Sequence, residues 1–87
     1  KKKKKYPRAK IGPNCIIFQQ VTLGTSSTRS GVPEIGGGVE LGAGARGPGS
    51  VKIGDHAIIG ANAVVVQDVP EAAIAVGIPA RVIAKRW

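Results

Sequence analysis

The sequence predicts one all-β domain, a parallel β-solenoid, and three observations support this fold class. An aliphatic residue followed by glycine recurs at multiples of six along the chain. A small or β-branched residue stands four positions after each of these anchors. A period of six fits neither an amphipathic helix nor an alternating strand. It is typical of a solenoid in which each hexad supplies one short strand and one corner.

The anchors predict how the coils stack. Three hexads close one triangular coil, so the repeat accounts for about three coils. Stacked coils place every third anchor in one ladder of parallel strands, about 4.8 Å apart. The expected ladders are Ile11, Ile35 and Ile53; Ile17, Leu41 and Ile59; and Leu23, Gly47 and Val65.

Two departures interrupt the repeat. Gly47 stands where a branched aliphatic residue is expected, and Pro48 follows it. We expect a void or a local bulge there, with a loss of about 2–4 kcal/mol of stability. Residues 25–34 are rich in loop formers, and their Arg29 cannot be a core anchor. We expect this segment to be a loop that protrudes from one corner, with a degenerate hexad as the alternative.

The two ends of the chain differ from the repeat. Residues 1–10 begin with five lysines, and we expect a disordered basic tail because like charges repel one another. The solenoid domain then covers residues 11–87. After Pro70 the sequence stays apolar but loses the phase, so we expect it to fold across the last coil as an extended cap. Residues 82–87 could form a short basic turn.

Composition narrows the function classes. The net charge of +8 comes mainly from the two ends, and no aromatic residues alternate with the lysines to stack bases, so no specific nucleic-acid partner is expected. No apolar run approaches the roughly 18 residues of a membrane span, which makes a cytoplasmic protein the default. An 87-residue solenoid has two open ends and a small core, so self-association is expected.

Neither a metal site nor a disulfide is expected. Cys15 is the only cysteine and stands at an inward position, where a thiol behaves as a small hydrophobe. His56 is the only histidine, at an outward corner beside Asp55, and one histidine without a ligand cluster makes no zinc site. We expect a solvated corner residue there rather than a catalytic base.

Several stretches resemble the C-terminal half of a bacterial serine acetyltransferase, within the wider hexapeptide-repeat acyltransferase family. They are Gln20-Val-Thr-Leu-Gly24, Leu41-Gly-Ala-Gly-Ala45, Ile59-Gly-Ala-Asn-Ala-Val64, Asp68-Val-Pro70 and Val76-Gly-Ile-Pro-Ala-Arg81. The last of these is the most specific, because generic hexads cannot produce it. The resemblance implies left-handed coils, a homotrimer, and acetyl-CoA bound in the groove between neighbouring subunits.

The resemblance also implies the residues of a coenzyme site. Six small residues would line the groove, and two basic residues near the C-terminus would neutralise CoA phosphates. They are Gly24, Thr25, Gly42, Ala43, Gly60 and Ala61, with Arg81 and Lys85. Small side chains in register let a ligand approach the backbone closely. Alternatively, glycine and alanine simply satisfy the sterics of the corners, and both roles can hold together.

The catalytic groups that the resemblance implies are not in this sequence. The family's proton-accepting histidine lies on coils before this segment, and a second histidine in its loop corresponds here to Val32 before Pro33. We therefore expect no catalytic residue in this chain. One function is an acetyl-CoA-dependent O-acetyltransferase of serine acetyltransferase type, present as its cofactor-binding C-terminal portion. The alternative is a non-catalytic, truncated or engineered β-helix for assembly, favoured by the lysines, the glycine-rich stretches and the absent histidines.

Overall fold

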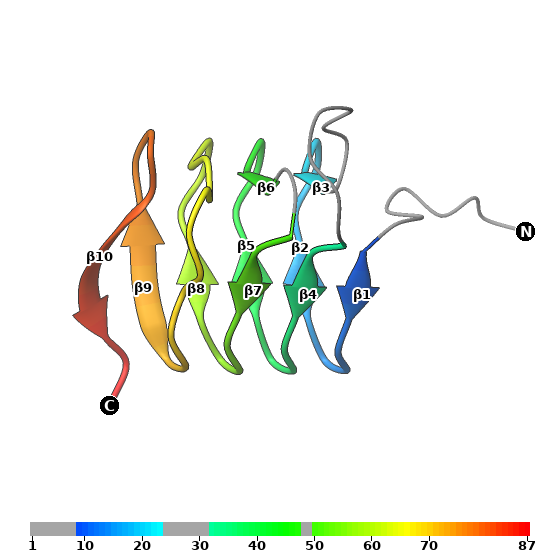
Figure 1. The fold of residues 1–87 in the computed structure, drawn as a ribbon, viewed down its shortest axis with the longest axis horizontal. Coiled ribbons are helices and arrows are strands. Elements are labelled where there is room, and N and C mark those ends of the chain that lie inside the picture. The colour runs from blue at the N-terminus through cyan, green and yellow to red at the C-terminus, as the bar shows by residue number, and fades with distance from the viewer. Residues whose placement is uncertain (1–8, 24–31, 48–49) are drawn as a thin grey trace, which may run out of the picture.

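The computed structural model describes residues 9–23, 32–47 and 50–87, and in these the chain winds as stacked coils of short strands (Figure 1). The strands are β1 (Lys10–Ile11), β2 (Ile16–Ile17), β3 (Thr22–Leu23), β4 (Glu34–Ile35), β5 (Glu40–Leu41), β6 (Arg46–Gly47), β7 (Lys52–Ile53), β8 (Ile58–Ile59), β9 (Ala73–Val76) and β10 (Arg81–Lys85). The first eight have two residues each, because a corner follows every strand. The described residues contain no helix.

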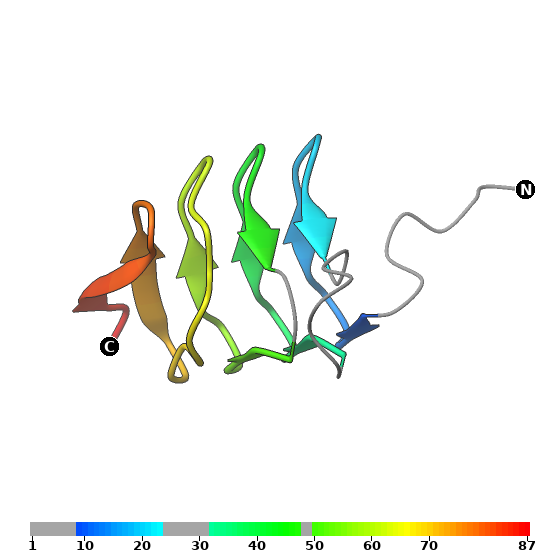
Figure 2. The same cartoon turned by 45° about the horizontal axis from the view of Figure 1, so that its top comes forward.

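The strands form three sheets, which are the faces of a triangular prism. Sheet A has the order β1-β4-β7, sheet B the order β10-β9-β8-β5-β2, and sheet C pairs β3 with β6. Figure 2 shows β3 and β6 on a face of their own. Every pairing is parallel except that of β9 with β10. The expected all-β, left-handed parallel β-helix is confirmed.

The strand register confirms the anchor ladders. Ile11 pairs with Ile35, and Ile35 with Ile53. The second ladder joins Ile17, Leu41 and Ile59, and in the third Leu23 pairs with Gly47. The backbone amide after each anchor donates to the carbonyl of the anchor in the next coil, as in the bond of 2.8 Å from Gly36 N to Ile53 O.

The first coil is longer than the second by one hexad. Ile11 and Ile35 are 24 positions apart, whereas Ile35 and Ile53 are 18 apart. The extra residues fall between Leu23 and Glu34, where a loop over 25–34 was expected; residues 25–31 of that loop are outside the described part. Glu34 itself is in β4. Lys10, which the sequence placed in the basic tail, is in β1, and its amide donates to Pro33 O at 2.9 Å. Residues 1–8 of the tail are also not described.

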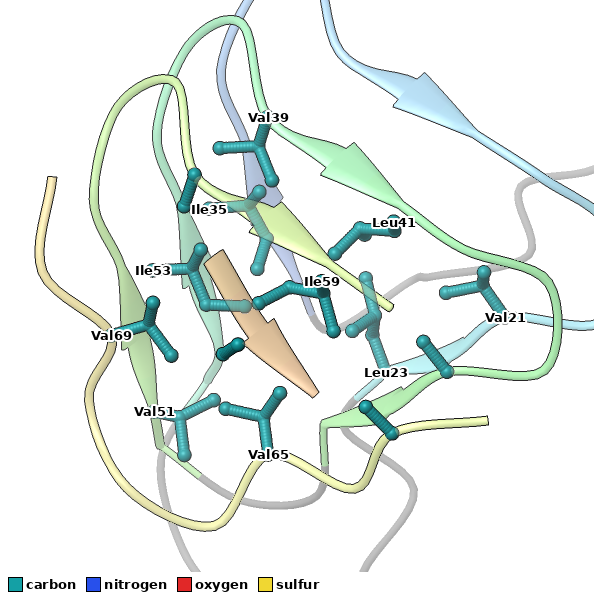
Figure 3. Close-up of a cluster of buried hydrophobic side chains, with 14 of the residues drawn as sticks. Val21, Leu23, Ile35, Val39, Leu41, Val51, Ile53, Ile59, Val65 and Val69 are labelled. Carbon is teal, nitrogen blue, oxygen red and sulfur yellow. The ribbon is translucent and has the colours of Figure 1, made fainter. Parts of the chain in front are cut away.

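The core is a column of aliphatic side chains that point inward from all three faces (Figure 3). Both the anchors and the residues four positions later contribute to it, as the repeat predicts. The buried members include Val39, Leu41, Ala57, Ile59, Ala63 and Val65. No polar or charged residue is buried among those described. The outward positions of the repeat are therefore the ones that carry polar and charged side chains.

The segment after Pro70 leaves the original phase, as expected, but it continues the stack before it caps the last coil. Ile53 bridges to Val69, and Ile59 pairs with Ala75, so each ladder advances by 16 residues instead of 18. The chain is shortened by two residues between Val64 and Val69, after which the repeat resumes in β9. Ala73 and Ala75 are buried as a fourth rung. The cap is β10, antiparallel to β9, in place of the basic turn expected over 82–87.

The void expected at Gly47 is not present. A Cβ atom added to Gly47 would lie 3.1 Å from Leu23 Cδ2, so the leucine side chain already occupies much of that space. Leu23 and Val65 are both buried. The loss of one anchor is thus compensated by its neighbour in the ladder.

Because Leu23 fills the space over Gly47, substitutions at these two residues should have non-additive effects on the free energy of unfolding. Leu23→Ala should cost about 4 kcal/mol, near the upper end for a buried leucine, because it empties the space over Gly47 as well. Gly47→Ala should restore about 1 kcal/mol in that background, yet be neutral or slightly destabilising alone, where its Cβ meets Leu23. Urea unfolding of the two single variants and the double variant measures this coupling. Strictly additive effects would show that the two sites do not share one space.

Candidate functional site

One corner of the prism, between sheets B and C, brings together most of the small residues predicted for a coenzyme groove. This B–C corner comprises residues 18–21, 42–45 and 60–63, one turn from each coil, and the turn at 77–80 between β9 and β10 continues it. Backbone hydrogen bonds join successive turns, with Gly44 N to Gln19 O at 3.0 Å and Asn62 N to Ala43 O at 2.8 Å. The result is a straight edge of glycine, alanine and short polar residues along the prism.

Each turn of the B–C corner contains a residue with positive φ, which explains part of its composition. The φ angles are 63° at Gln20, 76° at Gly44, 61° at Asn62 and 101° at Gly77. Glycine adopts this left-handed region without strain, and asparagine tolerates it better than most residues. The corner sequence is therefore constrained by backbone geometry before any ligand is considered.

Two glycines of the corner are also required by the stacking of the coils. A Cβ atom on Gly42 would lie 2.6 Å from Ala61 N, and one on Gly60 would lie 2.8 Å from Val76 Cγ1. Steric demands thus account for both glycines without a ligand. Ala43 and Ala61, in contrast, point to the outside, where Ala61 is exposed. Their amides bond to no other described residue, so they remain available as donors.

The structure does not bring all the predicted coenzyme residues to this corner. Gly24 and Thr25 are not described, and in sequence they follow sheet C, whereas Gly42 and Gly60 follow sheet B. Arg81 pairs with Val76 at the start of β10, directly beside the corner. Lys85 pairs with Ala73 at the other end of that strand, about 13 Å away at the usual rise per residue. The two basic residues therefore lie at opposite ends of β10.

The corner between sheets A and B, the A–B corner, contains His56. Asp55 and His56 lie over Gly36, Gly37 and Gly38 of the preceding coil. Asp55 Oδ1 accepts from Gly37 N at 2.9 Å, and a Cβ atom on Gly38 would lie 2.5 Å from His56 Nδ1. Two glycines of this run, Gly36 and Gly38, therefore have a packing reason, although the run seemed to favour an engineered module.

His56 is exposed, as expected, and the C-terminus packs beside it. Its ring lies 5.4 Å from that of Trp87 between centroids, and its carbonyl accepts from Arg86 Nη1 at 3.1 Å. The Asp55 carboxylate accepts from a backbone amide, and among the described residues no acidic side chain is hydrogen-bonded to the imidazole. A base needs such orientation beside its substrate. The described residues of the A–B corner include no such oriented pair.

The remaining candidates fit structural roles. Cys15 is half-buried against the core, with Sγ 3.1 Å from Gly36 O. Val32, at the position of the family's loop histidine, is half-buried and apolar. No group of three acidic, histidine or cysteine side chains within residues 9–23, 32–47 and 50–87 could bind a metal ion.

Across those same ranges, the structure contains no helix with the length and apolar character needed to cross a bilayer.

Known proteins share this architecture. A family model described as bacterial transferase hexapeptide (six repeats) matches residues 33–67. Serine acetyltransferase of Mycobacterium tuberculosis is 47% identical over 77 residues, which are 86% of this chain and 34% of that protein. The crystal structure of Neisseria gonorrhoeae serine acetyltransferase superposes with a TM-score of 0.81 at 36% identity, over 93% of this chain and 40% of the other. That of the Brucella abortus enzyme in complex with coenzyme A gives 0.78 at 31%, over 91% and 40%.

The fold and these matches together define a hexapeptide-repeat β-helix of the bacterial transferase class. The chain belongs to the hexapeptide-repeat acyltransferase family, and it is similar to the C-terminal part of serine acetyltransferases. It spans about a third of the length of the curated relatives that it matches.

Coil stacking predicts that an alanine substitution destabilises the fold at Gly42 but not at Gly37. Gly42→Ala should destabilise the chain by about 2 kcal/mol, since its Cβ would be forced against the backbone of the next turn. Gly37→Ala is the matched control: its Cβ would meet Pro13 Cδ at an ordinary 3.4 Å, and the change should stay within about 0.5 kcal/mol. Thermal unfolding followed by circular dichroism measures both. Equal losses in the two variants would contradict a steric role for Gly42.

Proposed function

We propose that this chain is the acetyl-CoA-binding C-terminal portion of an O-acetyltransferase of serine acetyltransferase type. The observation that supports this most is that nearly the whole chain superposes on enzymes of that kind, one of them solved in complex with coenzyme A. The ligand is assigned to the B–C corner. The amides of Ala43 and Ala61 have no partner among the described residues, and their methyl side chains leave the backbone accessible to the pantetheine arm.

Charge beside the corner suits the phosphates of the coenzyme. Arg81 is exposed next to Val76 and can form charge-assisted hydrogen bonds to a phosphate. Lys85, at the far end of β10, would reach only a ligand that extends along this strand. Gly24 and Thr25 enter the proposal through the family resemblance alone. The coenzyme is a co-substrate in this scheme: it supplies the acetyl group as a thioester.

We also propose a homotrimer in which the B–C corner faces a neighbouring subunit. Phe18 and Ile78 stand at opposite ends of this corner, with exposed fractions of 50% and 73%. A neighbour packed against this corner would remove both apolar side chains from water. A neighbour that covers them would form the second wall of the coenzyme groove.

The described residues supply binding and orientation, not proton transfer. Acetyl transfer to a hydroxyl group requires a base that accepts the hydroxyl proton as the oxygen attacks the thioester carbon. Such a base typically contributes about 10²–10⁴-fold to the rate. His56 lies at a different corner from the proposed coenzyme groove and lacks an acidic partner for its ring. The catalytic residues are therefore assigned to parts of the parent enzyme that this chain does not represent.

The second candidate is a non-catalytic β-helix for assembly. The five N-terminal lysines and the solvated His56 favour it, because neither has a role in acetyl transfer. Coenzyme binding separates the two candidates, since an assembly module has no reason to bind it.

Coenzyme binding is tested by calorimetry with CoA. Binding should be weak, and Ala61→Trp should reduce affinity at least about tenfold, because the indole would cover the amides at the B–C corner. Gln67→Trp, exposed on the corner between sheets C and A, is the matched control and should bind as the parent does. Equal binding by Ala61→Trp would remove the site from this corner. Binding that disappears at high salt would instead indicate attraction of a polyanion to the lysines.

Catalysis is tested by the release of thiol from acetyl-CoA, with and without serine. We expect no serine-dependent turnover by this chain alone, and no difference between the parent and His56→Ala. Turnover that is lost in His56→Ala would make this histidine the catalytic base. Turnover that survives the substitution would indicate a base elsewhere in the chain, and it would equally contradict the assignment.

A further inference from the structure

The outer face of sheet A bears a row of charged side chains that the coenzyme proposal does not use. Lys10, Glu34, Lys52 and Asp68 each precede the inward residue of their rung, and all four are exposed. Lys10 pairs with Glu34, and Glu34 with Lys52. Lys52 N donates to Asp68 Oδ1 at 2.9 Å, which places the fourth residue beside the third. The charges along this stripe therefore alternate as plus, minus, plus, minus.

The stripe borders a shallow groove of about 790 Å³ along the same face. Its floor includes Gly12, Gly36 and Gly54, where a Cβ atom would collide with the next coil. With no side chains on these glycines, the charged groups stand above the surface beside them. The face can thus receive a second row of side chains between its own.

We propose that this stripe binds the same stripe of a second copy of the chain, across a two-fold axis that sets the two prisms antiparallel. Read in reverse, the stripe is minus, plus, minus, plus, so each of its four charges meets an opposite one. Lys10 then faces Asp68 of the second copy, and Glu34 faces its Lys52. A parallel arrangement would oppose like charges at every position, which is unfavourable. The pattern is complementary to itself in one direction only.

The spacing of the stripe selects a second copy over an extended peptide. The rungs of both prisms rise by about 4.8 Å, so four pairs of charges remain in register. The side chains on one side of an extended strand are about 6.8 Å apart, and they would lose register within two steps. A single exposed ion pair contributes little, but several pairs bordering a groove can act as a network. We expect a weak, salt-sensitive association.

This interface leaves the proposed coenzyme corner free. In the cross-section of the prism, Ile53 and Val69 on sheet A lie opposite Val21 at the B–C corner (Figure 3). Copies that pair through sheet A therefore do not compete with neighbours at the B–C corner. The predicted effect is a doubling of whatever mass the chain otherwise has, a dimer from monomers or a hexamer from trimers. Pairing of this kind does not depend on the proposed function.

Charge reversal tests the pairing by sedimentation of the full chain at several concentrations. Glu34→Lys and Lys52→Glu should each weaken the doubling at least about tenfold, because each places two pairs of like charges across the axis. An equal mixture of the two variants should restore it, since each variant's reversed residue meets its opposite on the other. Arg46→Glu, at an exposed residue of sheet C, is the matched control and should leave the association unchanged.

The mixture separates the interface from effects within one chain. Like charges between adjacent rungs of a single variant persist in the mixture, so only contacts between copies can be repaired there. The double variant Glu34→Lys/Lys52→Glu should also associate. It tests the interface even if one of the single variants fails to fold. No doubling by the parent chain would overturn the proposal. So would doubling that single reversals leave intact, or a mixture and a double variant that both fail to associate.

Increasing the salt concentration from about 0.1 M to about 1 M shortens the screening length from about 10 Å to about 3 Å and should weaken the association of the parent.

Discussion

Coil-to-coil hydrogen bonding is the interaction on which the rest of this structure depends. Each short strand gains its partners only from the coils above and below it, since two residues cannot form a stable element alone. The backbone must therefore approach its neighbour closely at every corner as well as on every face. This requirement explains the glycines at the corners, where a Cβ atom on Gly12 would lie 2.7 Å from the carbonyl carbon of Gly36. It also explains why the core consists of small and branched aliphatic residues.

The same stacking organises the surface. Because equivalent residues of successive coils form ladders, each face and corner repeats one kind of chemistry. Sheet A presents alternating charges, the B–C corner presents alanine and glycine, and the A–B corner carries Asp55 and His56. Functional sites of this fold are consequently rows of residues eighteen or so positions apart, rather than clusters within one loop. The proposed coenzyme groove and the proposed two-fold interface are both rows of this type.

The sequence predicted the ladders because a six-residue period is compatible with few folds besides the solenoid. It did not predict the shortening before Val69, because Val65 continues the old phase and the change is visible only in the backbone pairing. The compensation at Gly47 depends on the direction of the Leu23 side chain, which no pattern encodes. The packing reason for Gly36 and Gly38 lies one coil further on, at Asp55 and His56.

The basic residues predicted for the coenzyme site lie apart in the structure, and the cause is again a backbone feature that the repeat does not reveal. Arg81 and Lys85 are only four positions apart in sequence, but β10 was not expected as a strand, and an extended strand separates its two ends. The juxtaposition of Gly42 and Gly60 was easier to predict, because these residues share one position of the repeat and the strand register alone brings them together.

Cross-strand nuclear Overhauser effects in the isotope-labelled chain test the stacking most directly. The observed register predicts contacts that link Ile11 to Ile35, Ile35 to Ile53, and Ile53 to Val69. Contacts from Ile53 to Glu71 instead of Val69 would mean that the eighteen-residue repeat continues unbroken. That result would contradict the fourth rung, the position of β10 and the placement of Asp68 at the end of the charged stripe.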